Sequence, residues 1–112
     1  MEAMLGPKLK VWVVFDDGVK FGDGRVQLLE RVESLGSLRQ AVAGMGMSYR
    51  AAWGYLRELE RAAGFKFLER HPGRGRTRLT TEGKRFLERY RRFRQGLDDV
   101  VASRFARSFR RR

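Results

Sequence analysis

The feature that most restricts the fold of this chain is a very short link, Gly-Met-Gly-Met at residues 44–47, between two segments with helical periodicity. On each side of the link, apolar residues recur every three or four positions, which is typical of a helix with one buried face. They are Leu38, Ala41, Val42 and Met45 in the first segment, whose end overlaps the link, and Ala52, Leu56, Leu59 and Ala63 in the second. Four residues allow only a tight turn, whose glycines tolerate a positive φ. The sequence therefore predicts two helices, over residues 37–45 and 48–63, joined by that turn.

The helix boundaries are marked by small polar residues and glycines. Ser37 and Ser48 can each accept the first free amides of a helix, while Gly36 and Gly64 are typical of helix ends. A further helix is predicted over residues 24–35, with Asp23 as its cap. Its predicted buried residues are Val26, Leu29, Val32 and Leu35.

Two short hairpins flank these helices. Residues 8–15 are rich in β-branched and aromatic types and are followed by the turn Asp-Asp-Gly, which predicts a β-hairpin over residues 8–21. Residues 65–79 contain two short strand patterns around the loop Pro-Gly-Arg-Gly-Arg. This second hairpin has a basic tip.

The C-terminal segment is predicted to be one long helix that Thr80 or Thr81 caps. Its apolar residues recur every three or four positions: Phe86, Tyr90, Phe93, Leu97, Val101, Phe105 and Phe109. A lone projecting helix is unstable in water, so the residues from Phe86 to Phe105 in this set are expected to form a homodimer interface. The spacing departs from a heptad, which favours a local antiparallel or crossed pairing with the N-terminal elements over a regular coiled coil.

Helix, short helix, tight turn, helix and basic hairpin is the order of a winged helix-turn-helix. The predicted fold class is mainly α with small β: a winged helix-turn-helix domain over residues 1–80, with an N-terminal β-hairpin, and a long C-terminal dimerisation helix over residues 81–112 with a basic tail.

The positive charge is concentrated in one part of the chain. The formal net charge is +12, yet residues 1–63 carry nine bases against eight acids, whereas residues 64–94 carry eleven against three. Such an excess indicates a polyanionic partner, nucleic acid or an anionic membrane surface, although a merely solubilising face is the alternative. The chain has no cysteine, and its N-terminus lacks the layout of a signal peptide or membrane span. We expect a cytoplasmic protein without membrane association.

The second helix of a helix-turn-helix enters the major groove with its N-terminal residues facing the base edges, while the first crosses the backbone. Double-stranded DNA is therefore the expected partner. The predicted DNA contacts are Ser48, Tyr49, Arg50, Trp53 and Arg57 on the reading helix, Ser37 and Gln40 on the helix before it, and Arg74, Arg76 and Arg78 in the wing. Arg50 can donate two hydrogen bonds to a guanine edge, and the wing arginines suit backbone or minor-groove contact.

Structural roles compete with some of these contacts. Ser37 and Ser48 can act as plain helix caps. Trp53 can stack on Tyr49 at the DNA face or join the core, and the general burial of large aromatics favours the core. Tyr55 is expected to be structural.

The chain shows no pattern of enzymatic chemistry. His71 stands alone, without the cysteines or second histidine that a metal site needs, and no nucleophile–base pair or carboxylate pair is indicated. We expect no cofactor and no enzymatic activity.

Three motifs carry a family resemblance across residues 36–83: Gly-Ser-Leu with Ala41 and Ala43, then GMSYRAAW, then LERHPGRGRTRLTTEG. The chain resembles the DNA-binding domain of LysR-type regulators and, more closely, that of ModE-type molybdate-dependent regulators. The hairpin at 8–21 is also similar to the ModE-type start. The resemblance implies a dimer with residues 48–57 as the reading helix and the wing gripping DNA beside it.

Two departures from the ModE pattern alter the expectation. Full-length ModE-type regulators continue into an oxyanion-binding domain, whereas this sequence ends at Arg112. No other ligand pocket is indicated, so we expect no direct molybdate sensing and no small-molecule effector. The wing is richer in arginine and poorer in glycine than the usual ModE-type wing, which implies stronger affinity for the DNA backbone.

The predicted function is that of a sequence-preferring transcriptional regulator. The alternative is an architectural nucleoid-type protein with little sequence preference that uses the wing and the basic tail. An RNA-binding module would need aromatic stacking platforms on a sheet, and the predicted sheets are too small for that.

Overall fold

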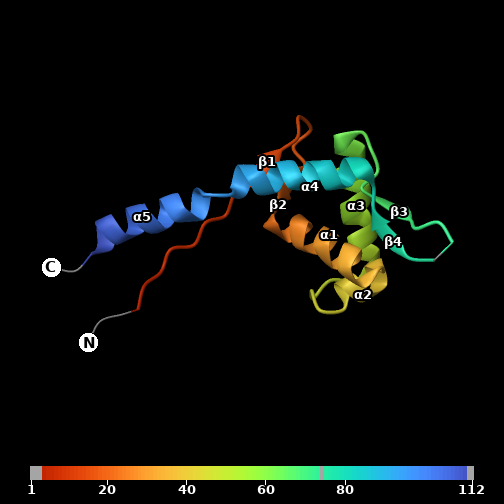
Figure 1. Cartoon of the computed structure of the whole chain (residues 1–112), viewed down its shortest axis with the longest axis horizontal. Helices are drawn as coiled ribbons and strands as arrows, with labels where there is room; N and C mark the ends of the chain where they lie inside the picture. Colours follow the sequence, from red (N-terminus) through yellow and green to blue (C-terminus); the bar gives the residue numbers. More distant parts are fainter. Residues whose placement is uncertain (1–3, 74, 111–112) are drawn as a thin grey trace.

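The computed structural model describes residues 4–73 and 75–110. Its elements are, in order, β1 (Trp12–Val14), β2 (Lys20–Gly22), α1 (Asp23–Leu35), α2 (Leu38–Val42), α3 (Tyr49–Ala63), β3 (Leu68–Arg70), β4 (Thr77–Leu79), α4 (Thr81–Arg94) and α5 (Leu97–Phe109). The order of helices and hairpins is the predicted one, and the fold is a winged helix-turn-helix (Figure 1). No helix of the described residues is long and apolar enough to span a membrane.

Both hairpins are antiparallel and shorter than predicted. In the first, Trp12 pairs with Gly22, and Gly18 takes a left-handed φ of 92° in the turn. In the second, the wing, Leu68 pairs with Leu79 and Glu69 with Arg78. The wing and α5 project from opposite ends of the molecule (Figure 1).

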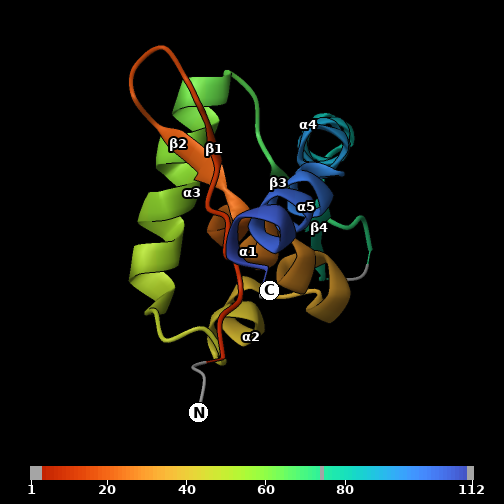
Figure 2. The same cartoon turned by 90° about the vertical axis from the view of Figure 1, so that its left-hand side faces the viewer.

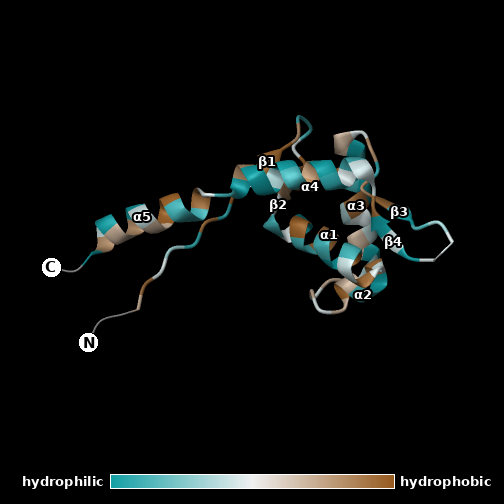
Figure 3. Ribbon diagram, in the orientation of Figure 1, coloured by the Kyte–Doolittle hydropathy of each residue, from teal (hydrophilic) through white to brown (hydrophobic). Residues whose placement is uncertain are grey.

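The core lies where α1, α2 and α3 meet the two hairpins and α4. Phe21 of β2 is fully buried at its centre, with ring centroids 6.3 Å from Phe67, 4.9 Å from Phe86 and 5.2 Å from Tyr90. Most of the aliphatic part of the core comes from α1, α2 and α3, and Leu68, Leu79 and Leu87 add to it from the wing and α4. Hydropathy colouring shows apolar residues also along α5, which projects away from this core (Figure 3).

The buried face of α1 differs from the predicted one. Its buried residues are Arg25, Leu28, Leu29 and Val32, while Leu35 is 39% exposed. The four predicted residues are each three positions apart, and side chains at that spacing drift around a helix with 3.6 residues per turn. The observed residues follow the i, i+3, i+4, i+7 spacing that keeps one face.

The predicted cap of α1 is also wrong. The N-cap is Gly22 and makes no side-chain cap bond, while Asp23 is the first helical residue. The Asp23 carboxylate accepts a hydrogen bond from the Tyr90 hydroxyl at 2.8 Å and lies 3.4 Å from Arg94 Nη2. The Asp23 side chain therefore contacts residues of α4 instead of capping the first amides of its own helix.

The C-terminal segment is helical as predicted, but it is divided at Gln95 and Gly96. Gln95 has an extended ψ of 133° and Gly96 a left-handed φ of 87°, so α4 and α5 are separate helices. Leu87 and Tyr90 of α4 are in the core, whereas α5 has no buried residue. The compact body therefore extends through α4, past the predicted boundary at residue 80.

Candidate nucleic-acid interface

Helix α3 has one buried and one exposed face, as its sequence predicted. Ala52, Leu56 and Leu59 are buried, and Arg50 and Arg57 are exposed. The helix lies along the outer side of the body, with α2 beside its N-terminal end (Figure 2). An entire helix face is thus open to a large partner.

The first turn of α3 begins at the predicted cap. Ser48 Oγ accepts a hydrogen bond from the Ala51 amide at 3.0 Å. Ser48 and Arg50 are exposed, whereas Tyr49 is half-buried against the core. Arg50 is therefore the exposed cationic side chain of the leading turn.

Trp53 lies on the exposed face of α3, so the expectation that favoured the core is wrong. Its side chain is 37% exposed, and its ring packs edge to face with Tyr49 at 6.2 Å. Arg57 Cζ lies 5.9 Å from the Trp53 ring centroid. Since Ala52 is at the centre of the buried stripe, the next residue along the helix is rotated away from it. The structure resolves the two alternatives in favour of the outer face.

Tyr55 has the structural role that was predicted. It is half-buried and packed against the core, and Arg25 Cζ lies 3.8 Å from its ring centroid. The side chain of Arg25 is 7% exposed and donates from Nη2 to Glu58 at 2.5 Å. Arg25 thus joins α1 to the side of α3 away from Trp53, a contact that sequence periodicity could not indicate.

Helix α2 and its cap contain two predicted DNA contacts, Ser37 and Gln40, and one exposed cation that was not predicted, Arg39. Ser37 Oγ accepts a hydrogen bond from the Gln40 amide at 3.2 Å, which confirms the predicted cap. Gln40 and Arg39 are both exposed, and Arg39 Cζ lies 4.1 Å from the Tyr49 ring centroid. The Gly-Met-Gly-Met turn brings Arg39 and Tyr49 together, although they are ten positions apart in the sequence.

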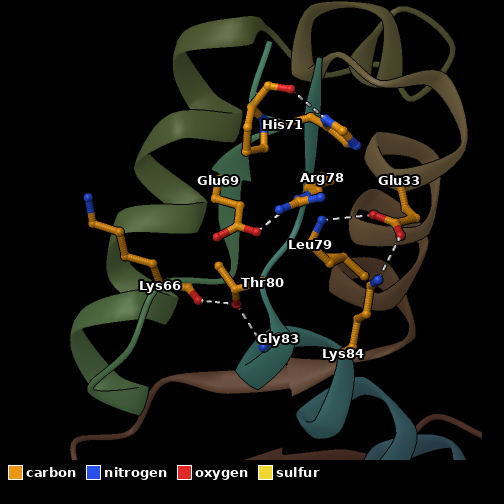
Figure 4. Close-up of polar contacts among 10 residues, drawn as sticks. Glu33, Lys66, Glu69, His71, Arg78, Leu79, Thr80, Gly83 and Lys84 are labelled. Carbon is orange, nitrogen blue, oxygen red and sulfur yellow. Dashed lines mark hydrogen bonds and ion pairs between the residues drawn. The ribbon is translucent and has the colours of Figure 1, made fainter. Parts of the chain in front are cut away.

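Side-chain hydrogen bonds fix the base of the wing (Figure 4). Glu33 of α1 accepts from the Leu79 amide at 2.8 Å. Thr80 Oγ1 donates to the Lys66 carbonyl at 2.6 Å and accepts from the Gly83 amide at 2.9 Å, so it caps α4 as predicted and ties that cap to the start of the wing. The wing is consequently held in one position relative to α1 and α4.

The three wing arginines have different surroundings. Arg74 lies outside the described residues. The Arg76 guanidinium rests against Gly36, where a methyl group would lie 2.6 Å from its Cζ atom, and the Thr77 amide donates to the Gly36 carbonyl at 2.9 Å. Arg78 donates to its cross-strand partner Glu69 at 2.8 Å. Arg76 therefore sits beside the start of α2, and Arg78 has an acidic partner.

The expected dimer residues fall into two groups. Tyr90 is 4% exposed and belongs to the interior of its own chain, so its assignment to a dimer interface is corrected by this burial. Phe86 packs against the core but is only half-buried. Phe93 is 48% exposed, and Leu97, Val101 and Phe105 are half-buried.

His71 is not part of a metal site in the described ranges. Its Nδ1 atom lies 3.1 Å from the Pro72 carbonyl oxygen (Figure 4). Within residues 4–73 and 75–110 no three His, Cys, Asp or Glu side chains form a group that could hold a metal ion. The chemistry of this face is that of cations, amides and aromatic rings.

An exposed second helix after a tight turn, flanked by a cationic hairpin, defines the winged helix-turn-helix class of proteins. The chain belongs to the LysR family of bacterial regulatory helix-turn-helix proteins, whose family model matches residues 24–84. The match begins in α1 and ends in the first turn of α4, so it contains α2, α3 and the whole wing.

Two relatives carry the name ModE. The chain is 36% identical over 69 residues to the transcriptional regulator ModE of Haemophilus influenzae. The matched stretch is 59% of this chain and 27% of that relative. It is 34% identical over 79 residues to the molybdenum transport protein ModE of Azotobacter vinelandii. That matched stretch is 68% of this chain and 29% of the relative. The chain thus spans less than a third of either protein, and the likeness concerns that part alone.

Proposed function

We propose that this chain binds double-stranded DNA with α3 in the major groove and the wing on the adjacent backbone, and that it acts as a sequence-preferring transcriptional regulator. The observation that carries the proposal is the exposed face of α3, which presents Arg50 at its leading turn beside a wing fixed to α1 and α4. Family membership and the ModE relatives support the same function.

We infer separate roles for the contacts. Arg50 would read a guanine edge, because a bidentate arginine is the commonest specific contact in the major groove. Trp53 and Arg57 would follow it along the groove. Ser37, Gln40 and the wing arginines Arg74, Arg76 and Arg78 would contact the backbone, which positions the protein without reading the sequence.

We also propose that the DNA-binding form is a homodimer joined through α5. Helix α5 has no buried residue, although Leu97, Val101 and Phe105 give it an apolar stripe. A helix of 13 residues is marginal in water without tertiary packing. A second copy would cover this stripe and place two α3 helices in successive major grooves, about one helical turn apart.

Selection of bound sites from random DNA, at stated salt, tests the proposal. A regulator should prefer its selected site over random DNA by about 10³ or more. A dimer with roughly 6 to 10 phosphate contacts should also lose about 10³ to 10⁵ in affinity between about 50 and 200 mM salt. Coincident binding curves for selected and random DNA would contradict the regulator and favour an architectural protein.

The roles of Arg50 and Arg76 can be separated by alanine substitution. Arg50→Ala should cost about 1–3 kcal/mol on the selected site and relax the preference at one base pair, because a base contact is lost. Arg76→Ala should weaken all sequences to a similar degree and reduce the salt dependence, because a phosphate contact is lost. Titration of the selected site and of variants at each base pair measures both effects. Equal, sequence-independent losses from the two substitutions would contradict the assigned roles.

A further inference from the structure

A hollow of about 480 Å³ lies between α2, α3 and the wing, next to the face that we propose reads DNA. Its walls include the rings of Tyr49 and Trp53. Three cationic residues line it: Arg39 from α2, and Lys66 and Arg70 from the segment that leads into and forms β3. Cations thus reach this space from both sides.

The charges around the hollow do not cancel. The acidic residue among its described lining is Glu69, whose carboxylate pairs with Arg78. Arg39, Lys66 and Arg70 take part in none of the ion pairs between described residues. An anion that entered the hollow would therefore meet three cations without carboxylate partners.

Arg39 is held in place by an aromatic ring. Its Cζ atom lies 4.1 Å from the Tyr49 ring centroid, and the Tyr49 ring is in turn packed edge to face against Trp53 at 6.2 Å. A guanidinium over the face of an aromatic ring is attracted to it electrostatically. That contact restricts a side chain that is otherwise rich in rotamers, so Arg39 has less freedom to lose when it binds. Tyr49, being half-buried, serves as the platform.

The position of the hollow indicates which part of DNA it would receive. When α3 lies in the major groove, the preceding helix crosses the backbone. Arg39 is on that preceding helix, and Lys66 and Arg70 face it from the wing side. The matching anion between these two elements is a sugar–phosphate strand rather than a base edge.

We propose that this hollow seats a segment of the DNA backbone and that Arg39 contacts a phosphate there, with Tyr49 as its positioning residue. The proposal rests on the DNA binding proposed above and adds Arg39, Lys66 and Arg70 to the interface. It also changes the role of Tyr49 from a direct reader of bases to the support of an arginine.

Arg39→Ala tests the phosphate contact in the full chain, with fluorescence anisotropy of the selected site and of random DNA over a series of salt concentrations. Loss of one phosphate contact should reduce the slope of log affinity against log salt by about 0.9 per chain. At about 0.1 M salt this corresponds to a roughly eightfold loss of affinity. Both DNAs should weaken alike. The matched control is Arg61→Ala, an exposed arginine in the last turn of α3 outside the hollow, which should leave the slope unchanged.

Two variants of Tyr49 test the positioning. Tyr49→Phe keeps the ring and should bind as the unaltered chain does, with the same salt slope. Tyr49→Leu removes the ring and should weaken binding. In the Tyr49→Leu variant, Arg39→Ala should weaken binding by less than it does in the unaltered chain. Circular dichroism of each variant checks that α3 is intact.

The outcomes distinguish the two proposals. An unchanged salt slope for Arg39→Ala, or an altered preference at a single base pair, would overturn the phosphate contact while leaving DNA binding in place. Fully additive effects of Arg39→Ala and Tyr49→Leu would overturn the positioning role. Absence of DNA binding by the unaltered chain would overturn the proposed function itself, and the hollow would lose its assigned occupant.

Discussion

At the scale of single residues, hydrogen bonding of polar groups decides where elements start and how they join. Ser37, Ser48 and Thr80 each accept a bond from an amide three residues ahead, as their sequence positions predicted. Glu60 has a less local role, because its Oε2 atom accepts from the Phe67 amide at 2.7 Å and thereby fixes the chain after α3. Local caps are visible in a sequence, whereas carboxylates that receive distant amides are not.

Tyr90 gives a pH-dependent prediction at this scale. Burial, followed by the hydrogen bond to Asp23, raises the pKa of the Tyr90 hydroxyl to about 12, against about 10 in an unfolded chain. The folded state then holds this proton more tightly than the unfolded state does. The resulting stability is present in full below about pH 10 and is lost as the pH rises through about 12.

Tyr90→Phe should remove that part of the pH dependence. By pH 12 the unaltered chain should have lost about 2 kcal/mol of unfolding free energy through this group, a loss that the Phe variant cannot show. Denaturant unfolding of both proteins between about pH 9 and pH 12 measures the difference. Parallel profiles for the two proteins would show that the Tyr90 hydroxyl does not lie in the environment described.

At the scale of elements, the close packing of α4 on the wing depends on Gly83. A methyl group at this position would lie 2.8 Å from the Phe67 carbonyl oxygen and 3.1 Å from Thr80 Oγ1. The backbone at Phe67, just before β3, cannot withdraw easily, because the Thr80 amide also donates to the Phe67 carbonyl at 2.9 Å. Helix α4 therefore approaches the wing only because this residue has no side chain.

Gly83→Ala should destabilise the protein by about 1–3 kcal/mol, since overpacking forces the helix and strand apart. Gly54→Ala is the matched control, because Gly54 is also helical but a methyl group there would meet open space. That substitution should stabilise α3 by about 0.5–1 kcal/mol through the better helix propensity of alanine. Thermal or denaturant unfolding gives both values, and a change of the same sign in both variants would contradict the packing of α4.

The division between α4 and α5 was not predicted, although a glycine stands at the break. The apolar spacing of the segment continues past Gly96 without interruption, and that spacing was the basis for a single helix. One tertiary contact anchors the end of α4 next to the break: Arg94 lies 3.4 Å from Asp23 of α1, and its side chain is 16% exposed. Arg94 also lies 3.1 Å from Asp98 of α5, four positions along the chain.

At the scale of the whole molecule, the chain is much more extended than a compact domain. Its radius of gyration is 17.4 Å and its principal extents are 62 × 31 × 23 Å, whereas about 13 Å is typical of a compact chain of this length. The excess comes from α5 and the N-terminal segment, which project from the same end of the body (Figure 1). Helix α5 carries the apolar stripe that we propose a second copy covers.

Val101→Asp tests the dimer at this scale. A carboxylate in the apolar stripe of α5 should convert a dimer into monomers, because its desolvation opposes pairing. Ser103→Asp, at an exposed position of the same helix, introduces the same group and should leave the dimer intact. Sedimentation at several protein concentrations measures the change. If both variants behave as the unaltered chain does, α5 is not the dimer interface.

The sequence by itself determined the local features of this protein: the order of its elements, the turn between α2 and α3, the buried stripe of α3 and three of its helix caps. Each depends on residues within a few positions of one another, where periodicity and capping rules apply. Only the tertiary structure decided the outward position of Trp53, the burial of Tyr90, the loss of Asp23 as a cap and the placement of Arg39 over Tyr49. These depend on which elements pack together, because a side chain selects its partner from groups that are close in space and can be far apart along the chain.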